Sequence, residues 1–211
     1  MKVKYFILII ILCVCVSACR EKPPDIEILR LYVMASEVYA QGQLSEAAKI
    51  LQNQNKFPPA LVLRAKAEYF SGELEKAEKS CYMALKLRPS SFEAAFYLAR
   101  ILLETGNSAG AQELTENLLT DNPQDIRALR LASEIAYENE KYGEALAFLD
   151  RAAEFSAESA MVLLDRARLL WIAGKGEQAL EDISRAKAML PWDTPLLRSI
   201  INLETTIKES I

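Results

Sequence analysis

The chain has 211 residues and a formal net charge of −4, and 51% of its residues are hydrophobic while 26% are charged. Such a composition can bury a core, which excludes a disordered chain, and the acidic balance gives no general attraction for nucleic acid. There is no histidine, which removes the commonest general base and the usual zinc ligand, so we expect no enzymatic activity, no cofactor and no metal site.

Residues 1–18 differ in character from the rest of the chain. Lys2 and Lys4 precede an apolar run over residues 5–16. The run is too short to cross a bilayer, which takes about 20 apolar residues, and it is typical of a signal peptide. It ends in the sequence Val-Ser-Ala-Cys at residues 16–19, and this ending resembles a bacterial lipobox.

The lipobox resemblance implies that residues 1–18 are removed and that Cys19 is lipidated. Several acyl chains together anchor a protein stably, so we expect a lipid-anchored protein of the bacterial cell envelope that reaches the membrane through its N-terminal lipid. Arg20 stands where an aspartate would favour the inner membrane, so the outer membrane is favoured. Two alternatives stay open: an ordinary secretory signal in which Cys19 is accidental, and a cytosolic protein that keeps Met1.

Residues 19–27 form the expected tether between the lipid and the folded part. The tether contains Pro23 and Pro24 and is short, so the folded part should lie close to the bilayer. Beyond Cys19 the only cysteine is Cys81. We therefore expect no disulfide in the mature protein and interpret Cys81 as a buried core residue.

From residue 28 to residue 193 one pattern recurs, in units 28–57, 58–91, 92–125, 126–159 and 160–193. Two sites in every unit hold a small residue, which lets two helices cross closely. These sites are Ala35, Ala65, Ala99, Ser133 and Ala167, and then Ala47, Ala77, Ala111, Ala145 and Ala179. Between them a glycine turn is expected at Gly42, Gly72, Gly106 and Gly174, with Glu140 as the exception. A proline stands at the exit of the second helix in four of the five units, at Pro59, Pro89, Pro123 and Pro191.

This pattern resembles the tetratricopeptide repeat (TPR), a helix-turn-helix unit of 34 residues. The resemblance implies an all-α protein, a right-handed α-solenoid of about five repeats. The first unit is four residues short, so we expect its second helix, near residues 45–54, to be shortened. Arg64 and Glu68 stand where apolar packing residues are usual, which leaves the register of the second unit, and so the role of Tyr69, open.

Residues 194–211 are expected to form a final helix. Thr194 and Pro195 are typical of a helix start, and one apolar face follows. That face consists of Leu196, Ile200, Leu203, Ile207 and Ile211. We interpret this helix as a cap over the end of the solenoid; the alternative is that the face is left open for a partner.

The TPR resemblance implies that the first helices line a concave groove, in which the fifth, ninth and twelfth positions of each repeat share one face. The predicted groove residues at these positions are Tyr32, Tyr39, Lys66, Tyr69, Phe96, Arg100, Arg130, Tyr137, Arg168 and Trp171. They predict an aromatic row beside isolated cations, which suits an extended or helical peptide of some acidic character. Two alternatives stay open: the aromatic row packs against the next hairpin, or the cations belong to an ordinary solvated face.

The favoured function is therefore a lipid-anchored scaffold that binds a protein or peptide partner in its groove. The combination of repeats and lipobox is similar to envelope TPR lipoproteins, such as pilus pilots and assembly factors, and implies assistance in assembling a cell-envelope complex. The alternative is a small-ligand or transporter-associated binding lipoprotein, which an enclosed apolar pocket between hairpins would favour. The oligomeric state does not follow from these patterns.

Overall fold

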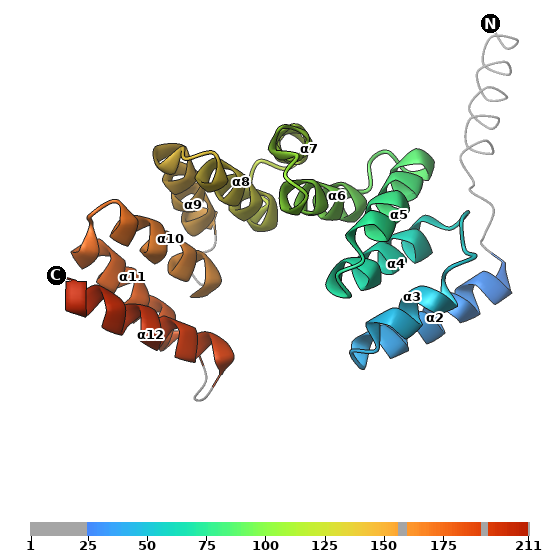
Figure 1. The fold of residues 1–211 in the computed structure, drawn as a ribbon, viewed down its shortest axis with the longest axis horizontal. Coiled ribbons are helices and arrows are strands. Elements are labelled where there is room, and N and C mark those ends of the chain that lie inside the picture. Colours follow the sequence, from blue (N-terminus) through green and yellow to red (C-terminus); the bar gives the residue numbers. More distant parts are fainter. Residues whose placement is uncertain (1–24, 156–159, 191–193, 211) are drawn as a thin grey trace, which may run out of the picture.

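A computed structural model describes residues 25–155, 160–190 and 194–210. These residues form eleven α-helices and no β-strand, arranged as five antiparallel pairs and a final helix. The pairs are α2 (Ile26–Ala40) with α3 (Leu44–Ile50), α4 (Pro58–Phe70) with α5 (Leu74–Leu87), α6 (Phe92–Glu104) with α7 (Ser108–Asp121), α8 (Ile126–Glu138) with α9 (Tyr142–Phe155), and α10 (Ala160–Ile172) with α11 (Gly176–Ala188), followed by α12 (Pro195–Ser210). The pairs follow one another along an arch with α2 and α12 at its two ends (Figure 1). The predicted all-α solenoid with a C-terminal capping helix is confirmed.

Small residues lie at each crossing between paired helices. All ten residues predicted for these sites are buried, and nine of them are alanines that are no more than 1% exposed. Because a small side chain lets two backbones approach closely, these sites set the separation within each pair. Cys81 is buried in the same core, and burial raises the pKa of its thiol to about 12.

A residue in the left-handed conformation ends the first helix of every pair. The φ angles are 78° at Gly42 and Gly72, 83° at Gly106 and 74° at Gly174. Glu140, which lacks the expected glycine, has a φ of 60°. Its backbone N–H donates to the Tyr137 carbonyl at 2.9 Å, as that of Gly106 donates to the Leu103 carbonyl at 3.0 Å. The helix-end hydrogen bonds therefore impose the turn even where the residue type resists it.

The first pair departs from the others at both of its ends. Helix α2 begins at Ile26, where Asp25 accepts a hydrogen bond from the Glu27 amide at 3.1 Å. Residues 26 and 27, assigned to the tether from the sequence, are therefore helical. Helix α3 has seven residues, whereas α5 has fourteen, and it ends at Ile50 rather than near residue 54. The predicted shortening is confirmed and is larger than expected.

Arg64 fills the space that the short α3 leaves. Its Nη1 donates to the carbonyl oxygens of Leu51 and Gln52, at 3.3 and 2.9 Å. The guanidinium group therefore binds the backbone immediately after α3, where the chain has left the helix. Arg64 Nε also donates to Ser80 Oγ at 3.0 Å, and that hydroxyl donates to Glu68 Oε2 at 2.5 Å. The two residues that obscured the register from the sequence are thus a buried polar network.

The register of the second repeat is the predicted one. Ala65 is buried and Gly72 is left-handed, as their counterparts are in the other repeats. Tyr69 therefore lies on the face of α4 that the repeat pattern assigns to it.

Helix α12 covers the C-terminal end of the arch. Thr194 Oγ1 accepts a hydrogen bond from the Leu197 amide at 3.1 Å, which confirms the predicted start of the helix. Ile200 and Ile207 are fully buried against α10 and α11, and Leu196 and Leu203 pack beside them. The apolar face of the helix is therefore not left open for a partner.

The predictions for residues 1–24, including the lipidation of Cys19, lie outside the described residues. Among the helices that the structure describes, none combines the length and the apolar character that crossing a membrane requires.

Candidate functional site

The first helices of successive pairs line the inner side of the arch. Helix α4 contacts both α2 and α6, and α6 contacts α8. In the middle of the arch α4 and α6 lie on the inner side, while α5 and α7 lie outside them (Figure 1). Side chains that project between these first helices therefore reach the concave surface.

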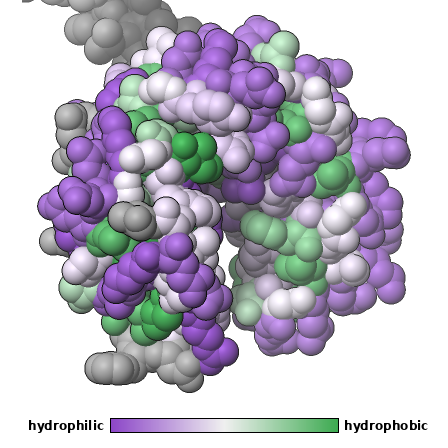
Figure 2. Space-filling model, turned by 60° about the vertical axis from the view of Figure 1, so that its left-hand side comes forward, coloured by the Kyte–Doolittle hydropathy of each residue, from purple (hydrophilic) through white to green (hydrophobic). Residues whose placement is uncertain are grey.

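A hollow of about 430 Å³ opens on this surface between α2, α4, α6 and α8. We call it the N-terminal groove and define it by six lining residues: Tyr32, Val62, Lys66, Glu93, Tyr97 and Arg127. The space-filling view shows a hollow between the two ends of the arch, with separate hydrophobic patches on a mainly hydrophilic surface (Figure 2). Such an open, mixed surface differs from an enclosed apolar pocket.

An aromatic cluster stands at the edge of the N-terminal groove. The rings of Tyr69 and Phe70 lie 5.0 Å apart, and Tyr97 lies 5.7 Å from Tyr69 and 6.0 Å from Phe70, all in edge-to-face contact. Phe70 is 53% exposed. Burial raises the pKa of Tyr97 to about 12, so its phenol stays neutral. Tyr69 and Tyr97 hold the exposed Phe70 ring in place by edge-to-face contact. Exposed aromatic rings that are held in this way often contact a binding partner.

Charges of alternating sign cross the floor of the groove. Glu93 lies between two cations, with its carboxylate 3.7 Å from Lys66 Nζ and 2.5 Å from Arg127 Nη1. The Lys66 ammonium also lies 5.4 Å from the centre of the Tyr97 ring. Three successive first helices are thereby joined by one ladder of ion pairs.

Comparisons with known proteins agree on the architecture. A family profile described as "Anaphase-promoting complex, cyclosome, subunit 3" matches residues 71–152. Anaphase-promoting complex subunit 3 of Schizosaccharomyces pombe is 23% identical over 163 residues, which cover 75% of this chain and 24% of that protein. A DnaJ homolog subfamily C member 7 homolog of the same yeast is 26% identical over 200 residues, 85% of this chain and 42% of that protein. The chain thus spans less than half the length of either relative.

Solved structures share the arrangement of helices over most of the chain. A thermophilic TPR protein of Thermus thermophilus has a TM-score of 0.72 at 16% identity, over 83% of this chain and 97% of that one. A tetratricopeptide repeat protein of Parabacteroides merdae also has a TM-score of 0.72, at 22% identity over 85% of this chain and 70% of that one. The fold is the TPR fold. YrrB, described as a TPR protein with an unusual peptide-binding site, has a TM-score of 0.58 at 14% identity, over 80% of this chain and 89% of that one.

The TPR arrangement divides the predicted aromatic row into packed and accessible members. Phe96 is buried in the core and presents little surface to a partner. Tyr32 and Tyr39 pack against the core of the first pair, and the Trp171 indole donates to Ser210 of α12 at 2.9 Å. Phe96, Tyr39 and Trp171 therefore serve packing, whereas Tyr32 packs on one side and also lines the N-terminal groove.

Tyr69 and Tyr137 are the members of the row that contact exposed aromatic neighbours. Tyr69 supports the exposed Phe70, whereas Tyr137 is itself exposed and lies 5.6 Å from Tyr142, ring to ring. Some residues of the predicted aromatic row therefore pack in the core, and others are accessible to a partner.

The expectation of isolated cations is wrong, since each predicted cation has an acidic neighbour. Besides the Lys66 pair, Arg100 lies 4.0 Å from Glu104 and donates to the Tyr69 hydroxyl at 3.1 Å. Arg130 and Arg168 share Asp165, at 2.6 and 3.8 Å. These acids come from the same first helix or from the next one, where TPR stacking brings them close. A preference for acidic peptides therefore has no support in the groove.

The sequence analysis missed Phe70, Glu93, Tyr97 and Arg127. They occupy the second, sixth and thirteenth positions of their repeats, which form a stripe beside the one that was considered. Members of this stripe contact residues of neighbouring repeats: Phe70 meets Tyr97, and Glu93 meets Arg127. Extending the search by one helical stripe would have found these residues.

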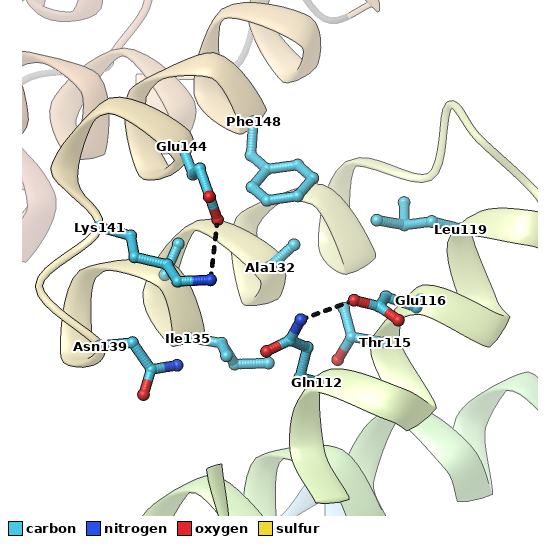
Figure 3. Close-up of a pocket in the computed structure, with 11 residues that line it drawn as sticks. Gln112, Thr115, Glu116, Leu119, Ala132, Ile135, Asn139, Lys141, Glu144 and Phe148 are labelled. Carbon is cyan, nitrogen blue, oxygen red and sulfur yellow. Dashed lines mark hydrogen bonds and ion pairs between the residues drawn. The ribbon is translucent and has the colours of Figure 1, made fainter. Parts of the chain in front are cut away.

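A second pocket, of about 90 Å³, lies between α7 and the α8–α9 pair (Figure 3). Leu119, Ile135 and Phe148 form its apolar floor, and a Gln112–Glu116 hydrogen bond of 2.7 Å crosses its rim. Pockets that hold small ligands are usually about 300–1,000 Å³. The pocket is too small for the small-ligand function that was the alternative.

Proposed function

We propose that this protein is a protein-interaction scaffold whose N-terminal groove binds a peptide segment of a partner protein. The observation that carries the proposal is the aromatic cluster with the exposed Phe70 beside a charged, open hollow. An accessible aromatic ring on a preformed base contributes contact area at low entropic cost. YrrB, which shares the fold, is described as having a peptide-binding site.

The groove favours a partner segment that carries charges of both signs around an apolar anchor. Lys66 and Arg127 flank Glu93 on the floor, so a bound segment meets positive and negative groups in alternation. Complementary charges on the segment would fix its register, while the apolar anchor would contact Phe70. Such a segment fits the groove better than a uniformly acidic one.

The Phe70 ring can be tested against a matched control. Tyr82 on α5 is 52% exposed, almost the same as Phe70, but it lies on a second helix, away from the groove lining. A photo-crosslinking amino acid at position 70 or 82 should capture the partner only from position 70. With the captured partner purified, Phe70→Ala should weaken binding at least about tenfold by calorimetry, and Tyr82→Ala should leave it unchanged.

Both variants are expected to keep the wild-type circular dichroism spectrum, because both side chains are exposed. Equal capture from positions 70 and 82, or equal loss of affinity in the two alanine variants, would contradict the groove as the binding site.

We further propose that the scaffold is lipid-anchored through Cys19 and serves the assembly of a complex in the bacterial cell envelope, at the outer membrane. The support is the sequence of residues 1–19 and their similarity to a lipoprotein signal. Intact-mass spectrometry of the protein from its own cells tests the anchor. An acylated chain that begins at Cys19 is the expected result, whereas a chain that keeps Met1 would place the scaffold in the cytosol.

A further inference from the structure

Helix α2 leaves an apolar face uncovered at the N-terminal end of the arch. Ile26 is 82% exposed and Val33 is 53% exposed, and Leu29 and Met34 are also exposed. Ile26, Leu29 and Val33 recur along one helix every three or four residues, and Met34 adjoins Val33, so the four form one strip. The strip is an exposed hydrophobic patch at an end of the solenoid, where interaction sites are expected.

The position of α2 explains why the strip is uncovered. Val33 is the sixth residue of its repeat, and Tyr97 is its counterpart in the third repeat. Tyr97 packs against Tyr69 and Phe70 of the preceding repeat. Within the described part of the chain no repeat precedes α2, so no described repeat packs on the same face.

The two ends of the solenoid are not complementary to each other. Helix α12 turns its apolar face inward and presents mainly polar residues to solvent, among them Ser199, Asn202 and Thr206. A head-to-tail stack would place this polar surface on the apolar strip of α2. An apolar strip is better matched by an identical strip.

Charges on α2 indicate how two such strips would meet. Arg30 and Glu37 are exposed, and neither makes an ion pair within residues 25–155, 160–190 and 194–210. They are seven residues apart and therefore lie on one face, two turns from each other. If two copies of α2 run antiparallel about an axis between Val33 and Met34, each Arg30 lies opposite Glu37 of the other copy. A parallel pairing would bring like charges together.

We propose that α2 binds α2 of a second copy of this chain, antiparallel about a two-fold axis between Val33 and Met34. The dimer buries Val33 and Met34 of each copy at its centre and forms two Arg30–Glu37 ion pairs between the copies. A contact made by one helix from each copy is small among protein interfaces, so dimers should form at concentrations on the order of 10–100 μM. The concave groove does not take part, so the dimer is independent of peptide binding.

Sedimentation velocity of the purified full-length protein, over a concentration series, tests the proposal. The wild type should move from monomer to dimer, and Val33→Asp should remain a monomer. Leu87 provides the control, because it is 47% exposed on α5 and lies outside the strip. Leu87→Asp should dimerise as the wild type does, and both variants should keep the wild-type circular dichroism spectrum.

Charge reversal tests the antiparallel arrangement. Arg30→Glu alone places Glu opposite Glu37 twice in the dimer, and Glu37→Arg alone places Arg opposite Arg30 twice. Each should raise the dimer dissociation constant at least about tenfold. The double variant Arg30→Glu/Glu37→Arg should restore it, because the exchanged pair is again complementary.

Three results would overturn the proposal. The wild type could remain monomeric up to about 500 μM, well beyond the expected range. The wild-type dimer could survive Val33→Asp, which would place the interface elsewhere. Finally, the strip could bind lipid vesicles in a manner that Val33→Asp abolishes, with no dimer in solution, which would identify a membrane surface as its occupant.

Discussion

Repeats two and five carry an arginine at the same place, the seventh residue, with different partners. Arg64 meets Ser80 and the carbonyl groups at the end of α3, with Glu68 beside it at 3.7 Å. Arg166 makes two hydrogen bonds of 2.6 Å to Asp182, and a third contact of 3.3 Å to Asp150 on α9. Each arginine therefore joins its own helix pair to the second helix of the preceding pair.

The difference between the two sites follows from the length of the preceding helix. Helix α3 ends at Ile50, so the carbonyl groups of Leu51 and Gln52, which follow it, reach Arg64. Helix α9 continues past Asp150, so its carbonyl groups are occupied within the helix and a side chain supplies the acceptor. The third repeat has Leu98 at the same place. In both of these repeats the neighbouring repeat thus provides acceptors for the arginine at this position.

The largest effect is expected from Arg64→Met. The change keeps much of the side-chain volume but removes the cation that lies 3.7 Å from the buried Glu68 carboxylate and the side-chain donor to the Leu51 and Gln52 carbonyls. Removing one partner of a buried ion pair costs about 3–5 kcal/mol. Urea denaturation followed by circular dichroism should show this loss in the free energy of unfolding.

The double variant Arg64→Leu/Glu68→Leu serves as the control for that measurement. It reproduces Leu98 and Leu102, which occupy the same two places in the third repeat. Replacing both charged partners by apolar residues is often close to neutral, so most of the loss should be recovered. A double variant as unstable as Arg64→Met would show that the carbonyl contacts, rather than the unpaired charge, dominate.

A smaller effect is expected from Asp182→Asn in the fifth repeat. The substitution removes the charge that holds Arg166, but this arginine is half-buried and keeps its contact with Asp150. Losing a hydrogen bond to a charged group costs about 1.5–3 kcal/mol. The same urea titration compares the two variants. If Asp182→Asn lost more free energy of unfolding than Arg64→Met, the fifth repeat would depend more on its arginine than the second repeat does.

The smallest expected effect on the free energy of unfolding is its dependence on pH, to which Glu68 and Glu204 should contribute with opposite signs. Burial raises the pKa of Glu68 above its ordinary 4.5, although Ser80 and Arg64 oppose the shift. Hydrogen bonds from Lys187 and Lys208 lower the pKa of Glu204 below 4.5. As the pH falls towards 4.5, Glu68 takes up a proton in the folded chain before the unfolded chain does, which stabilises the fold. Below 4.5 the contribution of Glu204 is lost instead.

Two variants separate these contributions. Relative to Glu68→Gln, the wild type should gain stability between pH 7 and about pH 5. Relative to Glu204→Gln, it should lose stability between about pH 5 and pH 3.5. Unfolding free energies at the three pH values check the signs, and a gain of the same sign against both variants would be inconsistent with these shifts.

Local rules account for the parts of the fold that were predicted correctly. Ala65 and Ala77 indicated a helix crossing because only a small side chain permits close approach, and Gly72 indicated a turn because its left-handed backbone favours glycine. The groove was predicted less well. Tyr69 was found from its helical stripe, but Phe70 and Tyr97 were missed because they lie on the adjacent stripe, and Phe96 proved to be core.

The amino-acid sequence by itself determined the repeat, the shortened first unit and the capping face of α12, because each depends on residues within one hairpin or one helix. The tertiary structure alone decided which polar side chains meet. Glu93 pairs with Arg127, Tyr69 with Glu104, and Arg130 with Asp165, all about one repeat apart along the chain. The repeat period brings equivalent helices side by side, but the partner of a long side chain depends on how two helices stack. For the same reason, only the stacked structure reveals that the apolar strip of α2 is left uncovered by the other described helices.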